Sequence, residues 1–419
     1  MSDLSRRNLI KAAGIAAAPA ALLAANDRIQ IGVIGAGGRG YYLTTRYYEG
    51  SAGLGNIAAV CDAYDDRLAK IKDLVQTKEN KTPKATKDYK EILADPSIDA
   101  VVIATPEHLH FPMFMEAMKA GKHVYLEKPL SHTIEEGWEM LKAHEKAGKV
   151  VQVGTQNRSN SLYIKAKEMI AQGMIGEVHY VRAFWYRNSL EDNPAWRYQI
   201  PANADPTNTD WDRFLGSTAK KRPFNKERFY QWRLYWDYSG GISTDLLVHQ
   251  TDITNFVCGK TVPLSCMASG GIYRWTKDDR EVPDTLSAVY EYPGNFHINY
   301  SCYFGNDHYG YGEQFMGNEG TIEVNSRSIL QYFPETFRGA APAHIKSRKP
   351  ETIEIAGNDN KAVEAHILNW LESVQGKAKP IAPPSVGQEA AIGGHLATLS
   401  YRNNKKVLWD AKTSKYRFV

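Results

Sequence analysis

Between residues 28 and 153, short runs of β-branched and apolar residues alternate with amphipathic segments, and this alternation constrains the fold more than any other feature of the chain. The amphipathic segments have helical spacing, and Thr133 with Glu136 predicts a capping box at the start of one of them. Strand–helix repetition with continuous apolar strands predicts a parallel sheet covered on both faces. The expected strands are 28–35, 56–62, 99–106, 122–129 and 149–155.

Beyond about residue 158 this repetition stops, and strands with alternating apolar and polar residues follow. A mostly antiparallel sheet of this kind has one covered face and one open face. The predicted fold class is α/β: an N-terminal Rossmann domain with a parallel sheet over residues 26–157, then an α+β domain with an open, mostly antiparallel sheet over residues 158–419. The second domain is expected to contain strands 177–187, 284–293, 296–304 and 312–325 and helices 161–176, 362–376 and 390–403.

Length and composition indicate two globular domains. The 419 residues are 43% hydrophobic and 23% charged, which excludes a disordered or fibrous chain. The formal net charge of +4 does not indicate a nucleic-acid surface. The four cysteines are widely spaced, so free buried thiols are expected, although one disulfide among Cys258, Cys266 and Cys302 is compatible with an oxidising compartment.

The first residues of the chain have the pattern of a twin-arginine export signal. Arg6 and Arg7 stand in the segment SRRNLIK, and the alanine-rich run 12–25 that follows is too short to span a bilayer. Twin-arginine signals direct folded proteins across the membrane. The sequence therefore predicts a signal over residues 1–25, removed near residues 24–26, and a periplasmic mature protein without a membrane anchor.

A glycine-rich turn, GAGGRG, connects the first expected strand to a helix that begins at about residue 38. Gly35 permits the tight turn, Gly37 lets the backbone approach a pyrophosphate, and Gly40 allows the helix to pack closely on the sheet. Gly38 lies at the helix N-terminus, which favours an anion. The turn therefore predicts a dinucleotide-binding site.

The second strand ends at Asp62, where an acid accepts hydrogen bonds from the adenosine ribose hydroxyls. A carboxylate at this position repels a 2′-phosphate, so NAD is the predicted cofactor and NADP is disfavoured. Arg39, inside the glycine turn, softens that preference because a guanidinium attracts phosphate. A turn or helix-capping role for Asp62 is the alternative.

Two pairs of residues follow adjacent strands of the predicted parallel sheet. Thr105-Pro106 and Glu127-Lys128 stand at the carboxyl ends of these strands, where such sheets bind ligands. Both pairs are therefore expected beside the nicotinamide end of the cofactor. There Lys128 is placed to bind a substrate hydroxyl, and an ordinary surface lysine is the alternative.

The stretch GGISTDLLVHQTD predicts a helix from about Ser243, on which Asp245 and His249 share one face because they are four residues apart. The carboxylate is expected to orient the imidazole and raise its basicity, which suits removal of a hydroxyl proton during hydride transfer. Asp252 is expected to support the histidine from behind. A solvated polar stripe is one alternative, and a metal site is another, although no third ligand stands out.

Five of the nine tryptophans fall between residues 185 and 236, most of them in an insert over residues 188–238. Aromatic faces stack on the C–H surfaces of sugars, so this region is compatible with the wall of a saccharide site. A packed or oligomer-contacting excursion is equally compatible with the composition.

Together these motifs resemble the Gfo/Idh/MocA family, named for glucose–fructose oxidoreductase and inositol dehydrogenase. The resemblance rests on GVIGAGGRG, CDAYDDR, TPEHLH, AGKHVYLEKP, VGTQNR, GMIGEV, GGISTDLLVHQTD and GNEGTIEV, in this order. It implies a Rossmann domain and an open sheet through which oligomers form. It also implies that His249 accepts the proton, that Asp245 orients it, that Lys128 binds the reacting hydroxyl, and that His110 and Gln156 join the cofactor site.

A dinucleotide-binding site in an exported protein is consistent with NAD that is bound before export and then retained. This favours a periplasmic, homo-oligomeric oxidoreductase that acts on a ring hydroxyl of a sugar, glycoside or inositol and recycles its cofactor. The similar glycoside hydrolase family 109, which uses NAD transiently, provides the alternative of a redox-neutral glycosidase. A non-catalytic sugar-binding protein of the same fold is a third hypothesis. The resemblance also implies a cis Lys128–Pro129 peptide bond.

Overall fold

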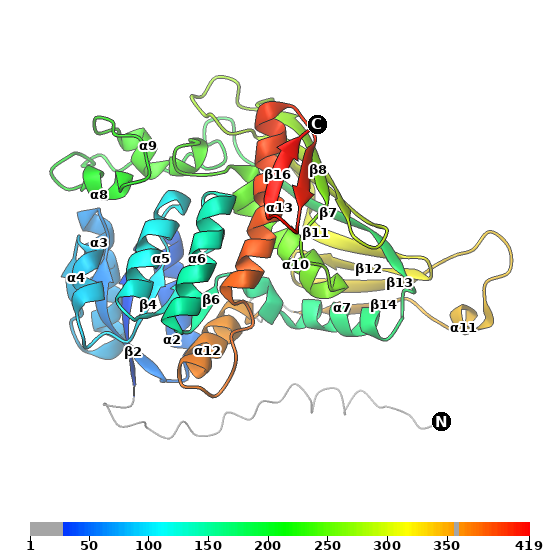
Figure 1. Ribbon diagram of the computed structural model, residues 1–419, viewed down its shortest axis with the longest axis horizontal. Helices are drawn as coiled ribbons and strands as arrows, with labels where there is room; N and C mark the ends of the chain where they lie inside the picture. The colour runs from blue at the N-terminus through cyan, green and yellow to red at the C-terminus, as the bar shows by residue number, and fades with distance from the viewer. Residues whose placement is uncertain (1–27, 356–359) are drawn as a thin grey trace.

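The computed structural model describes residues 28–355 and 360–419, so the expected export signal over residues 1–25 lies outside the described residues. Two β-sheets organise the chain, and the long helix α13 (Pro384–Asn403) stands between them (Figure 1). The first sheet has six strands and the second has ten. This architecture confirms the predicted fold class.

The first sheet has the strand order β3-β2-β1-β4-β5-β6, and all of its neighbouring strands are parallel. This is the order of a Rossmann sheet, in which ligands bind at the carboxyl ends where the order reverses. The short edge strand β3 carries no apolar run, so the sequence did not predict it. The strands are β1 (Ile29–Ile34), β2 (Gly55–Cys61), β3 (Lys84–Thr86), β4 (Ala100–Ile103), β5 (His123–Leu126) and β6 (Val151–Val153).

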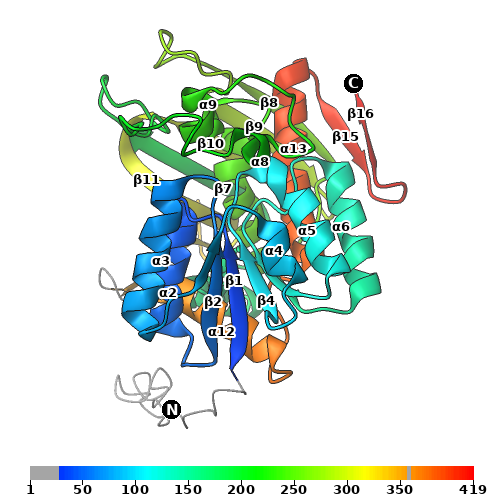
Figure 2. The same cartoon turned by 90° about the vertical axis from the view of Figure 1, so that its left-hand side faces the viewer.

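Helices cover both faces of this sheet (Figure 2). On one face α2 (Gly38–Gly50) and α3 (Asp65–Glu79) share an apolar core with the strands. On the other face α4 (Tyr89–Ala94), α5 (His110–Lys119) and α6 (Ile134–Ala147) do so. Helix α6 begins with the predicted capping box, in which the side chains of Thr133 and Glu136 each accept a hydrogen bond from the other's backbone N–H.

Helix α12 (Ala362–Val374) comes late in the chain but completes the first of these faces. Its Ile367 and Trp370 lie in the same core as Ile31 and Tyr125. The rings of Trp370 and Tyr125 meet edge to face with their centroids 5.7 Å apart. A helix from the C-terminal part of the chain thus covers apolar strand residues beside α2.

The second sheet has the order β14-β13-β12-β11-β7-β10-β9-β8-β15-β16, and only β7 and β10 pair in parallel. Residues 312–325, expected as one strand, form parts of β11 and β12 because the residues around Asn318 and Glu319 make a hairpin turn. The strands are β7 (Val178–Asn188), β8 (Ser265–Gly271), β9 (Thr285–Tyr292), β10 (Phe296–Tyr303), β11 (Gly305–Gly317), β12 (Gly320–Asn325), β13 (Ile329–Pro334), β14 (Glu351–Glu354), β15 (Val407–Asp410) and β16 (Lys415–Phe418).

One face of the second sheet packs against α7 (Ser161–Ala171), α10 (Val248–Cys258) and α13, and this contact contains the largest apolar core. The opposite face is open, as predicted. It carries exposed apolar side chains that alternate with the buried ones along the strands. These are Met267, Val289, Met316 and Phe333. The small helix α11 (Ala343–Lys346) lies in the connection between β13 and β14 (Figure 1).

Residues 188–238 leave the second sheet and cross to the Rossmann unit, and we call this segment the strap (Figure 1). It includes two short helices, α8 (Trp211–Leu215) and α9 (Lys226–Tyr230). The N–H of Asp210 donates to the carbonyl of Ala63 at 2.7 Å, and the N–H of Asp65 donates to the carbonyl of Asn208 at 3.0 Å. These bonds attach the strap to the loop between β2 and α3.

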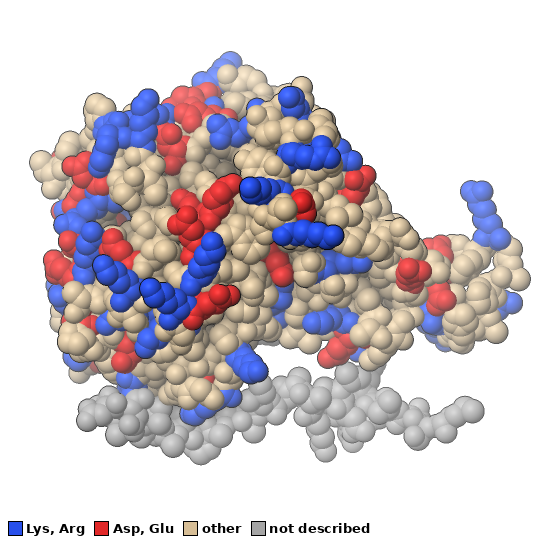
Figure 3. All heavy atoms as spheres, viewed as in Figure 1, with Lys and Arg blue, Asp and Glu red and all other residues tan. Residues whose placement is uncertain are grey.

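All four cysteines are free, so the disulfide that the sequence left open is absent. Within residues 28–355 and 360–419, no helix is long and apolar enough to cross a membrane. Basic and acidic side chains are interspersed over the face shown in Figure 3.

Candidate active site

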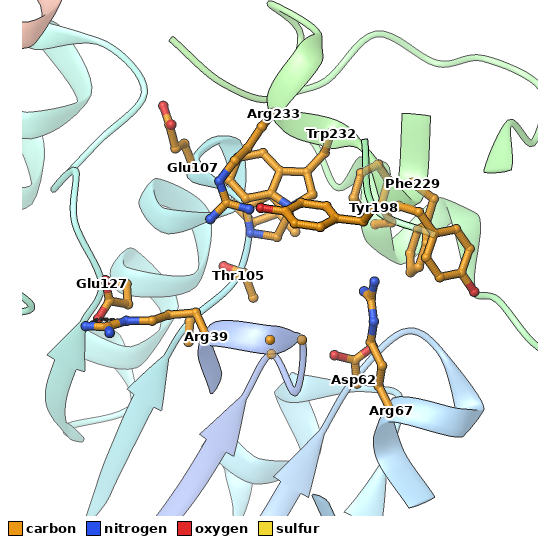
Figure 4. A pocket seen from close by; sticks show the side chains of 18 of the residues that line it. Arg39, Asp62, Arg67, Thr105, Glu107, Glu127, Tyr198, Phe229, Trp232 and Arg233 are labelled. Atoms are coloured by element: carbon orange, nitrogen blue, oxygen red, sulfur yellow. Dashed lines mark hydrogen bonds and ion pairs between the residues drawn. The ribbon is translucent and has the colours of Figure 1, made fainter. Parts of the chain in front are cut away.

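A cavity of about 740 Å³ opens at the carboxyl edge of the first sheet. The glycine turn forms its floor and residues of the strap lie above it (Figure 4). Asp62 after β2, Thr105 after β4, Lys128 after β5 and Trp185 of β7 also line the cavity. This volume is in the range of small-molecule sites, and the position is where Rossmann sheets bind nucleotides.

The geometry of the glycine turn fits a bound pyrophosphate. Gly35 has a φ of +92°, which favours glycine, and a Cβ on Gly40 would lie 1.8 Å from the Gly35 carbonyl oxygen. A Cβ on Gly38 would meet no atom within 4 Å, because it would point into open space. The first turn of α2, capped by Gly37, has no acidic residue and no side-chain cap, so its N–H groups are available to an anion.

Asp62 stands beside this turn, as the sequence predicted. Its Oδ2 accepts a hydrogen bond from the N–H of Ala36 at 2.7 Å, and its Oδ1 accepts one from the N–H of Tyr64 at 2.9 Å. Asp62 therefore fulfils the alternative turn role, yet each carboxylate oxygen keeps a lone pair for a ribose hydroxyl. Burial raises the pKa of Asp62, and the charge of Arg67 acts against this rise.

Arg39 points toward the opposite end of the cavity from Asp62 (Figure 4). Its Nε donates to Oε1 of Glu127 at 2.8 Å, and its Nη2 donates to Oε1 of Gln156 at 3.2 Å. The idea that Arg39 softens the preference for NAD therefore has no support from its position. Arg67 is the guanidinium beside Asp62, and sequence reasoning missed it although it stands five residues further along in the motif CDAYDDR.

Thr105 and Pro106 line the cavity directly after β4. The buried Oγ1 of Thr105 has no hydrogen-bond partner among the described residues, which is consistent with contact to a bound ligand. His110 does not line the cavity, contrary to the implied cofactor contact. Its ring nitrogens lie 2.7 Å from the carbonyl oxygen of Pro129 and 3.0 Å from that of Thr105, so it holds the two strand ends together.

Lys128, Asp245 and Arg233 form a charged cluster in the cavity wall. Nζ of Lys128 donates to the backbone carbonyl of Asp245 at 2.6 Å and to its Oδ1 at 3.0 Å, and Nε of Arg233 donates to the same Oδ1 at 3.2 Å. The side chains of Lys128 and Asp245 are only 12% and 11% exposed. Burial alone raises the pKa of Asp245, but the two cations outweigh it and hold that pKa below its usual range. The Lys128–Pro129 peptide bond is cis, as the resemblance implied.

His249 lines the same cavity but forms no hydrogen bond with Asp245. Its buried Nδ1 has no partner among the described residues. Burial, with Lys128 and Arg327 as further causes, holds the pKa of His249 well below its usual range. The charge of Asp245 does raise the pKa of this histidine, as expected, but the opposing effects are larger. Burial and the nearby cations outweigh the carboxylate, and the imidazole is neutral.

Glu107, which sequence reasoning missed, is a buried carboxyl at the wall of the cavity. It accepts hydrogen bonds from the N–H of Gly240 at 2.9 Å, from Oγ of Ser239 at 3.1 Å and from Oγ1 of Thr244 at 2.8 Å. Burial raises the pKa of Glu107 to about 7. It therefore joins the end of β4 to the residues just before Asp245. Its position in TPEHLH was the available signal, since the motif had already been placed at a strand end.

Asp252 does not support His249 from behind. Its Oδ1 accepts a hydrogen bond from Nε of Arg158 at 2.7 Å, and burial raises its pKa to about 6. The metal interpretation also gains no support, because the part of the chain that the structure describes has no group of three His, Cys, Asp or Glu side chains able to hold an ion.

The five tryptophans between residues 185 and 236 divide between the cavity wall and the packed interior. Three of them line the cavity, and two pack elsewhere against other aromatic rings. The cavity tryptophans are Trp185, Trp196 and Trp232, and the packing tryptophans are Trp211, on Phe214, and Trp236, on Tyr401.

Comparison with protein families agrees with this geometry. Residues 29–155 match the model described as the NAD-binding Rossmann fold of an oxidoreductase family. Two models of the C-terminal alpha/beta domain of that family match residues 159–269 and 216–408. The chain belongs to the Gfo/Idh/MocA family. Its Rossmann domain is an NAD-binding domain, so the predicted cofactor is confirmed.

Curated members of this family are similar over part of their length. The uncharacterized oxidoreductase YdgJ of Escherichia coli is 31% identical over 42% of this chain and 48% of its own. A glycosyl hydrolase family 109 protein of Shewanella amazonensis is 28% identical over 55% of this chain and 54% of its own. Myo-inositol 2-dehydrogenase of Thermotoga maritima is 26% identical over 49% and 48%. The chain thus spans about half the length of the curated relatives it matches.

Solved structures are similar over nearly the whole chain. A levoglucosan dehydrogenase in complex with NADH and levoglucosan has a TM-score of 0.70 at 18% identity, and covers 91% of this chain and 99% of its own. Aldose-aldose oxidoreductase from Caulobacter crescentus, complexed with glycerol, has a TM-score of 0.68 at 19% identity, with the same coverage. At these identities the likeness shows the fold.

Proposed function

We propose that this chain is an NAD-dependent oxidoreductase that acts on a ring hydroxyl of a sugar, glycoside or inositol. The observation that carries the proposal is the contact of Lys128 with Asp245 in the same cavity as a neutral His249, above the glycine turn. The inositol and sugar dehydrogenases among the relatives support the substrate class.

NAD, when bound, supplies the acceptor for a hydride from the carbinol carbon. Lys128 has three N–H donors, and Asp245 accepts two of them, so the third is free to donate to the oxygen of the reacting hydroxyl. His249 is neutral and accepts the proton of that hydroxyl. The lysine charge then stabilises the negative charge that develops on the substrate oxygen. Asp245 acts as a positioning residue, because it fixes the lysine.

We further propose that NAD remains bound through turnover. The strap supports this, because α9 closes over the Asp62 end of the cavity. The guanidinium carbon of Arg67 lies 5.1 Å from the ring centroids of both Phe229 and Tyr230. Nδ2 of Asn203 in the strap donates to Oδ2 of Asp66, in the first turn of α3, at 2.9 Å. Release of the cofactor from this end therefore requires these contacts to break.

The nucleotide content of the purified mature protein tests the retention of NAD. We expect about one NAD(H) per chain on denaturation, and slow exchange with labelled NAD. Arg67→Ala should speed that exchange, because it removes the stacking of the strap on the Rossmann unit. Arg402→Ala is the matched control, since Arg402 stacks on Trp236 outside the cavity. An empty site, or exchange within seconds in the wild type, would refute retention but not the oxidoreductase.

Substitution of the proposed catalytic residues tests the oxidoreductase itself. We expect Lys128→Met and His249→Asn each to lower kcat by roughly 10²–10⁴-fold, because each removes a group that donates to or accepts from the reacting hydroxyl. Lys146→Met, on the exposed side of α6, is the control for loss of a lysine charge. Nucleotide content should be unchanged in all three variants. A His249→Asn variant with the wild-type rate would refute the assigned proton acceptor.

The match to glycosyl hydrolase family 109 proteins favours a second candidate, a redox-neutral NAD-dependent glycosidase. Such an enzyme releases the aglycone of an aryl glycoside without net formation of NADH. An oxidoreductase that retains its cofactor instead reduces its bound NAD, at most one per chain, until a second substrate with a carbonyl group accepts the hydride. Binding of a sugar with neither reaction would favour the third hypothesis, a non-catalytic sugar-binding protein.

We propose that the mature protein is periplasmic, exported folded by the twin-arginine route with NAD in place, and free of a membrane anchor once the signal is removed. The segment around Arg6 and Arg7 supports this, together with the short alanine-rich run that follows. Fractionation of a producing bacterium tests it. Replacement of both arginines by lysine should leave the protein in the cytoplasm, and unchanged export would refute the assigned route.

We also propose a homo-oligomer formed through the open face of the second sheet. Val289, Met316 and Phe333 are 38%, 40% and 42% exposed on this face, so an interface formed there would bury apolar side chains from three strands. Light scattering should give a mass of two or more chains. Phe333→Lys should reduce that mass, and a monomeric wild type would refute the proposal.

A further inference from the structure

The region of the cavity around His249 holds more cationic than anionic side chains. Four cations line it, and the carboxyls there are Asp245 and Glu107. Two of the cations already bind Asp245. The four are Lys128, Arg187, Arg233 and Arg327.

Arg187 and Arg327 are the two cations left without an anionic partner. Within residues 28–355 and 360–419, neither forms an ion pair with a carboxylate. Their guanidinium carbons lie 5.0 and 5.1 Å from the ring centroid of Trp185. The Trp185 ring centroid is in turn 6.0 Å from that of His249. Trp185 therefore contacts both guanidinium groups and lies beside the proposed proton acceptor.

The backbone holds Arg327 in this position at some cost. Arg327 has a φ of +59°, a left-handed conformation that few residues other than glycine adopt, in the turn between β12 and β13. Its carbonyl oxygen accepts hydrogen bonds from Nδ2 of Asn160 at 3.0 Å and Nδ2 of Asn360 at 2.9 Å. Arg187, by contrast, reaches the cavity from the end of the regular strand β7. Two separate elements thus bring guanidinium groups to Trp185.

We infer that the substrate is an acidic sugar, whose carboxylate binds Arg187 and Arg327 while its reacting hydroxyl lies between Lys128 and His249. This inference rests on the proposed function. Guanidinium groups match the planar geometry of a carboxylate and bind it through paired N–H donors. Trp185 is buried and stacks on Tyr311 with ring centroids 4.7 Å apart, so it holds the two guanidinium groups at the cavity wall. The site should therefore discriminate acidic sugars from neutral ones, because a neutral sugar leaves both cations without a partner.

Matched pairs of sugars test the inference on the NAD-loaded protein. Glucuronate with glucose, and galacturonate with galactose, differ only in the carboxylate, and glucose 6-phosphate tests for an anion of a different shape. Binding is measured by calorimetry and turnover by absorbance of the reduced cofactor, so each is read independently. We expect the acids to bind roughly 10–100-fold more tightly than the neutral sugars, the range for a charge-assisted hydrogen bond. Salt should weaken the binding of the acids alone.

Variants at the two arginines make the assignment specific. Arg187→Gln and Arg327→Gln should each weaken binding of the acid about tenfold or more and change binding of the neutral sugar less than threefold. Arg187→Lys should bind the acid more tightly than Arg187→Gln and less tightly than the wild type, because it keeps the charge but lacks the paired donors of a guanidinium. Arg402→Gln is the control for loss of an arginine that stacks on tryptophan outside the cavity. Normal NAD content verifies that each variant is folded.

The outcomes separate the inference from the function on which it rests. Equal binding of acids and neutral sugars, or no binding of either, overturns the inference. Tight binding of glucose 6-phosphate without binding of uronates also overturns it and assigns the arginines to a phosphate. Arginine-dependent binding of uronates without any turnover supports the acidic ligand and refutes the oxidoreductase.

Discussion

Glu107 offers a test of how the buried charges of this site are arranged. Its side chain is 2% exposed and accepts hydrogen bonds from Ser239, Gly240 and Thr244. The perturbation is Glu107→Gln, which keeps the shape and one acceptor oxygen but removes the titration. Two effects are then expected. The free energy of unfolding falls by a constant amount, because the amide N–H₂ cannot accept a hydrogen bond, and its dependence on pH changes.

The second effect has a defined sign and size. Burial and, to a smaller extent, the charge of Asp245 raise the pKa of Glu107 from 4.5 to about 7, against the hydrogen bonds from Gly240 and Thr244 and the charge of Lys128. The folded protein therefore binds the proton more tightly than the unfolded chain does. The stabilisation of the folded protein by this proton is complete below pH 4.5 and is lost as the pH rises to about 7. At about 1.4 kcal/mol for each pH unit, the free energy of unfolding falls by roughly 3 kcal/mol over this interval.

Urea unfolding of the wild type and of Glu107→Gln at several pH values between 4.5 and 8 measures this effect. Other groups that titrate similarly in both proteins cancel in the difference between the two. We expect the wild type to lose about 3 kcal/mol relative to the variant across the range, with most of the loss between pH 5 and 7. A difference that stays constant within about 0.5 kcal/mol would refute the reasoning, because this carboxyl would then titrate alike in the folded and unfolded states.

Four further substitutions test the turn, the cluster and the late helix. Gly40→Ala places a methyl 1.8 Å from the carbonyl oxygen of Gly35 and should abolish NAD retention. Gly38→Ala is the control for the fold: its methyl meets no atom within 4 Å, so the unfolding temperature of the NAD-free protein should be unchanged. Asp245→Asn leaves two largely buried cations without their carboxylate and should lower the free energy of unfolding by roughly 2–4 kcal/mol in urea titrations. Gly50→Ala places a methyl 2.6 Å from Cβ of Glu364 on α12 and should cost roughly 1–3 kcal/mol in the same assay.

Local patterns predicted the parts of this structure that local forces determine. The five expected strands of the Rossmann sheet, the capping box at Thr133 and the glycine turn each depend on neighbouring residues, and each is present. Asp62 and Lys128 could be placed because parallel strands bring their carboxyl ends to one edge. The sequence therefore located the cavity, although it did not determine which side chains pair within it.

Contacts between distant residues were beyond such reasoning. Lys128 and Asp245 are 117 residues apart in the chain, and no local pattern indicates that they bind each other. The contact of Trp370 with Tyr125 was not predicted for a similar reason: the apolar stripe of α12 is visible in the sequence, but the surface that it covers is not. The cationic pair beside Trp185 was missed because its members are far apart in the chain. Arg187 stands in strand β7, and Arg327 stands in a turn with a left-handed backbone conformation.

The error about Asp245 and His249 has a specific structural cause. Residues four apart share a face only in a regular α-helix, and residues Ser243–Leu247 form a π-helical turn in which the N–H of Val248 bonds back to the carbonyl of Ser243. The wider turn leaves the carboxylate with Lys128 and the imidazole without an acidic partner. Glu107 binds the backbone and side chains that lead into this turn. The buried carboxyl therefore accounts for how the turn is held, and its titration is expected to affect the position of Asp245 as well as stability.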